Sequence, residues 1–237
     1  MTVIDPRSSI LSFIDDELIA EFAHDLRDRG IKLRLGCKAQ NVHAHDGFCI
    51  VDLSDGRKVK SDMVLYAAGR VGAADDLGLD AIGINADSRG RLSVDPVTYE
   101  TEASNVYAAG DIIGFPSLAS TSMTQGRIAI CHAFQVPDPA KPEHFPYGIY
   151  AVPEISTIGL SERELKEQGI PYECGIARFR ETSRGHIMGL QTGMLKMLFH
   201  LETRKLLGVH IVGEGATELI HIGQAVLVHG GELAYFL

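Results

Sequence analysis

Asp111 has the clearest potential for ligand chemistry in this sequence. It follows an apolar run and Gly110 in the segment 105–111, NVYAAGD. A carboxylate at the carboxyl end of a buried strand lies where open α/β sheets bind ligands, and sugar or ribityl hydroxyl groups are its natural hydrogen-bond donors. The segment therefore predicts a strand that presents one acidic acceptor to a bound ligand.

The residues after Asp111 predict the start of a helix. A Gly/Pro loop leads to the letters SLAS at 117–120, so the helix begins near Leu118 and Ala119. The first turn of a helix carries unpaired N–H groups and the positive end of the helix dipole. Such an end can stabilise the negative charge at the N1–C2=O edge of a reduced flavin, although many helices start at Ser-Leu-Ala.

A second candidate site involves Asp5, Arg7 and Gly69. Asp5 ends a short strand, where a carboxylate can accept hydrogen bonds from an adenosine ribose or can be a solvated turn residue. Arg7 could bind a 2′-phosphate, so the pair suits either NAD or NADP. Gly69 ends the apolar segment 63–70; it lets a ligand approach the backbone or is an ordinary strand-to-loop glycine.

Other polar residues give no sign of a catalytic or metal centre. His43 and His45 alternate on one predicted strand face without a third ligand nearby, so we expect a solvated hairpin. Ser161 and Ser183 have no recognisable base partner, and we assign no catalytic side chain. The four cysteines are scattered and form no C-x-x-C pair, which fits a reducing cytosol.

Charge and hydropathy exclude two classes of partner. The net charge of −9 and the lack of a Lys/Arg-rich run argue against a nucleic-acid surface. No apolar run reaches the roughly 18 residues that a membrane span needs. We therefore expect a cytoplasmic protein that acts on small molecules.

The elements that position these residues differ between the two ends of the chain. A strand at 1–5, a helix at 15–29 and a strand at 31–35 predict a parallel β–loop–α–β unit. Asp-Gly pairs at 46–47 and 55–56 predict the tight turns of an antiparallel meander.

The rest of the chain continues with a strand at 63–70, an irregular stretch at 72–100 and the helix from Leu118 to 134. A proline-rich linker at 136–142 precedes an α+β module, in which the sequence predicts a capping box at 161–164, strands at 172–179, 193–199 and 206–212, and a helix at 216–229.

Several sequence segments of the chain resemble motifs of a known superfamily, the pyridine nucleotide–disulfide oxidoreductases. The segments that carry the resemblance are 101–111, 66–70 (YAAGR), 153–156 (PEIS), 208–214 and 218–220. Within it, the chain is most similar to the soluble pyridine nucleotide transhydrogenase family through segments 114–120 (GFPSLAS), 125–129 (QGRIA), 148–150 (GIY) and 220–225 (IHIGQA). The resemblance implies an α/β plus α+β protein: an incomplete Rossmann-type NAD(P) domain with a meander over 1–72, a partial FAD-binding segment over 73–136, and a truncated interface domain over 144–237.

The resemblance also implies an enzyme in which FAD passes hydride between NADPH and NAD⁺, in a homodimer. Asp111, with Gly110, would bind the ribityl chain, and the backbone of Leu118 and Ala119 would face the flavin O2 edge. Asp5 and Arg7 would meet the adenosine end of the nucleotide.

Two G-x-G-x-x-G fingerprints of the family are absent from this sequence, so the chain looks like an internal piece of an enzyme about twice as long. Two alternatives remain open: a lipoamide dehydrogenase-like relative, or a non-catalytic truncated product that keeps only the interface domain.

Overall fold

Two compact units divide the chain. The computed structural model describes residues 1–137 and 144–237. One unit combines Met1–Tyr66 with Pro146–Leu237, and the other is Ala67–Phe145. No helix of the described residues is both long and apolar enough to cross a membrane.

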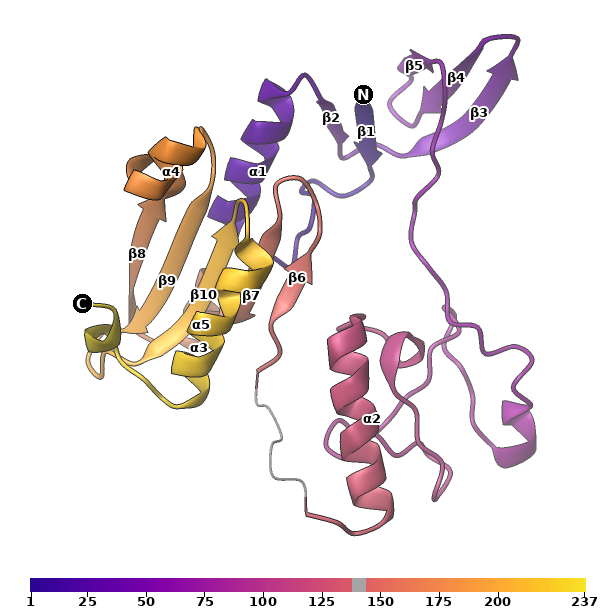
Figure 1. Ribbon diagram of the computed structural model, residues 1–237. Helices are drawn as coiled ribbons and strands as arrows, with labels where there is room; N and C mark the ends of the chain where they lie inside the picture. The colour runs from indigo at the N-terminus through magenta and orange to yellow at the C-terminus, as the bar shows by residue number, and fades with distance from the viewer. Residues whose placement is uncertain (138–143) are drawn as a thin grey trace. The chain divides into compact units, whose positions relative to one another are not determined.

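The N-terminal segment forms the predicted parallel β–loop–α–β unit (Figure 1). Strand β1 (Thr2–Asp5) pairs in parallel with β2 (Lys32–Leu35), and helix α1 (Asp16–Asp28) connects them. Asp15 caps α1 by accepting a hydrogen bond from the backbone N–H of Glu17, and acidic residues in the first turn suit the helix dipole. This pairing places Asp5 at the carboxyl end of β1.

The antiparallel meander is also confirmed. Strand β3 (Ala39–His45) pairs with β4 (Phe48–Leu53), and β4 pairs with β5 (Lys58–Ser61). Gly47 and Gly56 adopt positive φ at the two turns, which explains the Asp-Gly pairs. His43 binds Asp52 across the sheet rather than pointing with His45 at a shared ligand.

The C-terminal segment contains one antiparallel five-stranded sheet in the order β6-β7-β10-β9-β8. Its strands are β6 (Tyr147–Ile149), β7 (Ile155–Gly159), β8 (Tyr172–Arg178), β9 (Met194–His200) and β10 (Leu206–Val212). Its helices are α3 (Glu162–Gln168), α4 (Ser183–Met188) and α5 (Ala216–Val228), with 3₁₀ turns η3 (Phe179–Glu181) and η4 (Leu233–Phe236). The capping box at Ser161 and Glu164 is confirmed, as are the three predicted strands and the last helix.

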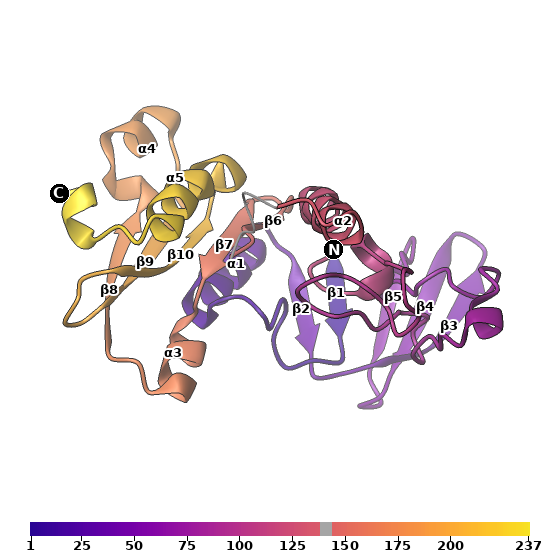
Figure 2. The same ribbon diagram turned by 90° about the horizontal axis from the view of Figure 1, so that it is seen from below.

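Helices α1 and α5 cover opposite faces of this sheet (Figures 1 and 2). Side chains alternate between the faces along each strand. Val209 and Ile211 of β10 pack in the cluster that includes α5, whereas Val212 packs in the cluster with Leu18 and Phe22 of α1. The first segment of the chain thus shares a hydrophobic core with the last.

The second unit has little regular structure. Its described residues contain two 3₁₀ turns, η1 (Leu79–Ile82) and η2 (Gly110–Ile113), and one helix, α2 (Ala119–Ala133). The expected strand at 63–70 is wrong: no strand is assigned there, and Met63, Leu65 and Tyr66 are almost fully exposed. Because no neighbouring strand in the described residues pairs with this segment, its apolar letters have no sheet to join. Most of the predicted linker at 136–142 lies outside the described residues.

Candidate functional site

The strand predicted to present Asp111 is wrong: only an isolated β-bridge joins Tyr107 to Glu100, and Gly110 begins the 3₁₀ turn η2 that carries Asp111. The φ of Gly110 is +84°, and a Cβ there would lie 3.0 Å from Ser122 Oγ, so the position requires glycine. The backbone N–H of Gly110 donates a buried hydrogen bond of 2.7 Å to Oε1 of Gln125 on α2. The turn and the helix are therefore held together by one side chain that the sequence did not single out for this role.

The start of α2 offers unpaired N–H groups, as predicted. Leu118 is the N-cap, and no side chain in the described part of the chain caps the first turn. Leu118 is half-buried and Ala119 is exposed. Ser122 Oγ instead donates to the carbonyl of Leu118. This helix end can therefore receive an acceptor atom of a ligand.

The Asp111 side chain is available to a ligand. It is exposed, and its carboxylate accepts no hydrogen bond from the described residues, while its carbonyl accepts from the N–H of Gly114. Thr121, in the first turn of α2, has a buried Oγ1 without a hydrogen-bond partner among those residues. One exposed acceptor and one buried donor beside a helix end suit a polar ligand.

Asp5 and Arg7 bind one another. The Asp5 carboxylate accepts from the backbone N–H of Arg7 at 2.8 Å, from its Nε at 3.0 Å and from its Nη2 at 2.7 Å. The side-chain hydrogen bond from Arg7 lowers the pKa of Asp5. The guanidinium is about half exposed, so its outer edge is still accessible to a phosphate.

Gly69 adopts a backbone conformation that favours glycine. Its φ is +113°, and a Cβ there would meet only Arg89 Nη2 at 3.5 Å. Gly69 belongs to the unit Ala67–Phe145, whereas Asp5 and Arg7 belong to the other unit, so the two places are described separately.

Two family models together match almost the whole chain. Residues 1–126 match the pyridine nucleotide-disulphide oxidoreductase model, and residues 145–236 match the dimerisation domain of the same group. The chain belongs to the pyridine nucleotide-disulphide oxidoreductase family. The resemblance drawn from the sequence is thereby confirmed.

Curated relatives of this oxidoreductase chain carry a more specific name. A protein of Mycobacterium bovis named soluble pyridine nucleotide transhydrogenase is 44% identical over 237 residues, which are 100% of this chain and 50% of the relative. A protein of the same name from Marinomonas is 42% identical and covers 99% of this chain and 51% of the relative. The chain spans about half the length of the curated relatives it matches.

Solved structures agree on the fold. LpdA of Mycobacterium tuberculosis superposes with a TM-score of 0.87 at 26% identity, over 97% of this chain and 50% of that one. The HOCl-induced flavoprotein disulfide reductase RclA of Escherichia coli gives a TM-score of 0.88 at 24% identity, over 98% and 54%, and shows the fold alone.

The residues around Gly110 fit a flavin, the cofactor that the family implies. Gly110 lets the turn lie close to Ser122 of α2, and α2 contributes N–H groups without a side-chain cap and the Thr121 hydroxyl, which has no partner among the described residues. Asp111 adds an exposed carboxylate for ribityl hydroxyls. The donors and the acceptor match the carbonyl edge and the hydroxyl chain of that cofactor.

Proposed function

We propose that this chain supplies one half of an FAD-dependent transhydrogenase that moves hydride between NADPH and NAD⁺. The observation that carries the proposal is the Gly110–Asp111 turn fixed to the open start of α2 by Gln125. The names of relatives at 42–44% identity support the same reaction. The flavin, when bound, accepts and returns the hydride.

The residues of this half bind and orient the flavin and the nicotinamide nucleotide. The Asp111 carboxylate holds a ribityl hydroxyl, and the backbone N–H groups at Leu118 and Ala119 stabilise negative charge on the flavin O2 edge. Arg7 and Asp5 recognise the adenosine end of the nucleotide. Gly69, which has no side chain, lets a nucleotide approach the protein backbone. We expect the complete enzyme to act in the cytoplasm as a homodimer.

A lipoamide dehydrogenase-like disulfide reductase is the second candidate, favoured by the disulphide oxidoreductase family to which the chain belongs. The coding sequence upstream of Met1 separates the two. A C-x-x-x-x-C pair after a first G-x-G-x-x-G fingerprint would favour disulfide reduction, because a thiol pair is the centre that such chemistry needs.

A chimera tests the function directly. Residues 1–237 replace the matching half of the Mycobacterium bovis relative, with which they align over 237 residues. We expect the purified chimera to keep a stoichiometric flavin band and to reduce a thionicotinamide analogue of NAD⁺ with NADPH. The 237-residue chain alone should show no such band, since no phosphate-binding fingerprint is present in it.

A chimera that folds, binds flavin and yet transfers no hydride between the two nucleotides would contradict the transhydrogenase proposal. Flavin binding by the isolated 237-residue chain, with hydride transfer, would contradict the view that it is only half of the site.

A further inference from the structure

A fully buried lysine lies in the middle of the C-terminal sheet. Lys196 is on β9, and its side chain is 1% exposed. In the antiparallel register it stands beside His210 of β10, which in turn stands beside Thr157 of β7. This polar row faces α1, because the neighbouring residues Met194 and Val212 on the same face pack against that helix.

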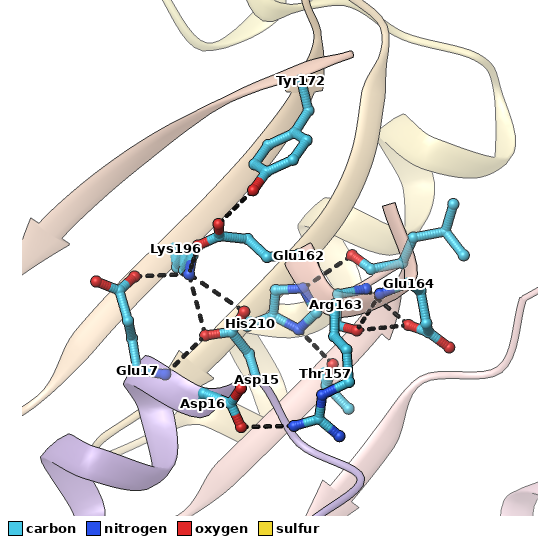
Figure 3. Close-up of polar contacts among 12 residues, drawn as sticks. Asp15, Asp16, Glu17, Thr157, Glu162, Arg163, Glu164, Tyr172, Lys196 and His210 are labelled. Carbon is cyan, nitrogen blue, oxygen red and sulfur yellow. Dashed lines mark hydrogen bonds and ion pairs between the residues drawn. The ribbon is translucent and has the colours of Figure 1, made fainter. Parts of the chain in front are cut away.

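Three carboxylates surround the Lys196 ammonium group, and two of them come from α1 (Figure 3). Nζ lies 3.1 Å from Oδ1 and 3.2 Å from Oδ2 of Asp15, the buried N-cap residue, and 2.6 Å from Oε2 of Glu17. It also donates to Oε1 of Glu162 on α3. The lysine therefore joins a residue 181 positions away in the sequence to its own sheet.

Further polar contacts join α1 to the C-terminal segment along the helix. Acidic residues of α1 face basic or hydroxyl residues of the C-terminal segment. The pairs are Arg163 with Asp16, Arg178 with Glu21 at 3.1 Å, and Thr192 with Asp25 at 3.0 Å. On the C-terminal side of these contacts Arg163 and Arg178 are partly exposed and Thr192 carries no charge, so Lys196 is the buried cation among the partners of α1 named here.

The charges in this cluster stabilise one another. Burial raises the pKa of Glu162, but hydrogen bonds from Lys196, Tyr172 and Lys166 outweigh it and lower the pKa to about 2. Burial alone would lower the pKa of Lys196, whereas its hydrogen bonds to the carboxylates raise it. Lys196 is thus charged at neutral pH, and a buried charge of this kind is costly to leave without its partners.

We propose that Lys196 is a positioning residue that locks α1, and with it the β1–β2 edge carrying Asp5 and Arg7, onto the C-terminal sheet. Leu33 and Leu35 of β2 pack in the same cluster as α1, so a shift of the helix moves the strand pair. The functional part of this inference rests on the proposed nucleotide site, whereas the mechanical part does not.

Hydrogen exchange of the 237-residue chain tests the mechanical part. Lys196→Met keeps most of the apolar stem and removes the charge. We expect the α1 amides to exchange on the order of 100-fold faster, because removing one partner of a buried ion pair leaves uncompensated charge. The amides of α5, on the other face of the sheet, serve as the internal reference for an intact fold.

Lys166→Met is the matched control. Lys166 also binds Glu162, at 3.1 Å, but its side chain is 67% exposed. It should change α1 exchange little, since exposed ion pairs contribute little. Equal effects of Lys196→Met and Lys166→Met, or unchanged α1 exchange in both, would overturn the proposal.

The effect of one substitution on α1 exchange, measured with and without Lys196, distinguishes an ion pair from ordinary packing. Asp15→Asn keeps a capping side chain and removes one carboxylate. It should speed α1 exchange in the wild-type chain and slow it in the Lys196→Met background, where the carboxylate is no longer neutralised. The same sign in both backgrounds overturns the proposal. If Lys196→Met does not fold, Glu162→Gln alone should speed α1 exchange about tenfold, and an unchanged rate overturns it.

The functional part is measured in the chimera with the Mycobacterium bovis relative. Lys196→Met should raise KM for the nucleotide about tenfold while kcat changes less, because the binding edge and not the flavin is displaced. Lys166→Met should leave both constants unchanged. An unaltered KM overturns the positioning role. A chimera that is inactive without any substitution counts against the proposed function alone, and the exchange results stand apart from it.

Discussion

Asp5 and Asp111 show how one residue type serves two purposes at the residue scale. The Asp5 carboxylate is neutralised by Arg7 at distances of 2.7–3.0 Å. The Asp111 carboxylate is exposed and accepts no hydrogen bond from the described residues. A ligand hydroxyl therefore gains a new charged acceptor at Asp111, but at Asp5 it must share the carboxylate with a guanidinium.

Asp111→Asn should weaken flavin retention in the chimera. The amide keeps an uncharged acceptor, so the loss is the difference between a charged and a neutral hydrogen bond, about 1–1.5 kcal/mol, and the flavin dissociation constant should rise roughly tenfold. Fluorescence of released flavin on dilution measures it. Asp80→Asn, an exposed charge change in the same compact unit, is the control. Equal retention in both variants would remove Asp111 from the site.

Arg7→Gln should weaken NADPH binding more than NADH binding. A guanidinium is the partner for the 2′-phosphate that only NADPH carries, and its removal also frees the Asp5 carboxylate to repel that phosphate. We expect a rise in KM of at least about tenfold for NADPH. Arg57→Gln is a matched control, because Arg57 binds Asp55 two residues away, as Arg7 binds Asp5. A similar loss for both nucleotides would contradict the assignment.

His210 should make stability fall at acidic pH. Burial lowers the pKa of this imidazole, and nearby Asp15 opposes that shift while Lys196 adds to it. Below its ordinary value of 6.5 the unfolded chain binds a proton that the folded chain refuses, so stability is present above that pH and is lost as the pH falls, by at most about 2 kcal/mol at pH 5. Urea unfolding of His210→Gln should show a smaller pH slope than wild type, whereas exposed His229→Gln should not. Identical slopes would contradict this.

At the scale of elements, local signals predicted local structure well. Helix α1 has its capping residue Asp15, and the hairpins have Asp-Gly turns at Gly47 and Gly56. The predicted strands at 63–70 and 105–111 were wrong: apolar residues suggested them, but no strand of the described residues pairs with either segment, and only an isolated bridge forms at Tyr107. Strand formation depends on a neighbouring strand that is often remote in the sequence, whereas caps and tight turns are built from adjacent residues.

Long-range contacts explain what the sequence could not predict about the sites. Asp111, Leu118 and Ala119 lie within nine residues of one another in the sequence, so their grouping could be predicted from it. Gln125 reaches back 15 residues to Gly110, and Lys196 reaches 181 residues to Asp15. A lysine within an apolar strand, at MLKMLF, is the one signal that could have indicated a buried ion pair.

Gln125→Ala should loosen the joint between α2 and the Gly110 turn. It leaves a buried N–H without a partner, which costs about 1–3 kcal/mol. Hydrogen exchange should become faster at Gly110 and in α2, and stay unchanged in α5 of the other unit. Thr124→Ala is the control, since its hydroxyl bonds only the carbonyl of Ser120 in the same helix. Equal exchange in the two variants would contradict the role of Gln125.

At the scale of the whole molecule, the match to a dimerisation domain directs attention to α5. Its inner face packs Ala216 and Ile220 into the sheet core, whereas Leu219 and Ile222 remain exposed on the outside. Exposed apolar residues at adjacent helical turns are typical of an interaction surface. We therefore expect this outer face of α5 to meet a second copy of the chain.

Ile222→Glu should shift the 237-residue chain from dimer to monomer. Burying a carboxylate against a symmetric partner brings two like charges together, because a two-fold interface repeats each residue, and the dissociation constant should rise at least about 100-fold. Sedimentation velocity across micromolar concentrations measures the shift. Ile187→Glu on α4 is the matched control, because Ile187 is even more exposed but lies outside α5. If both variants sediment like the wild-type chain, the outer face of α5 is not the dimer contact.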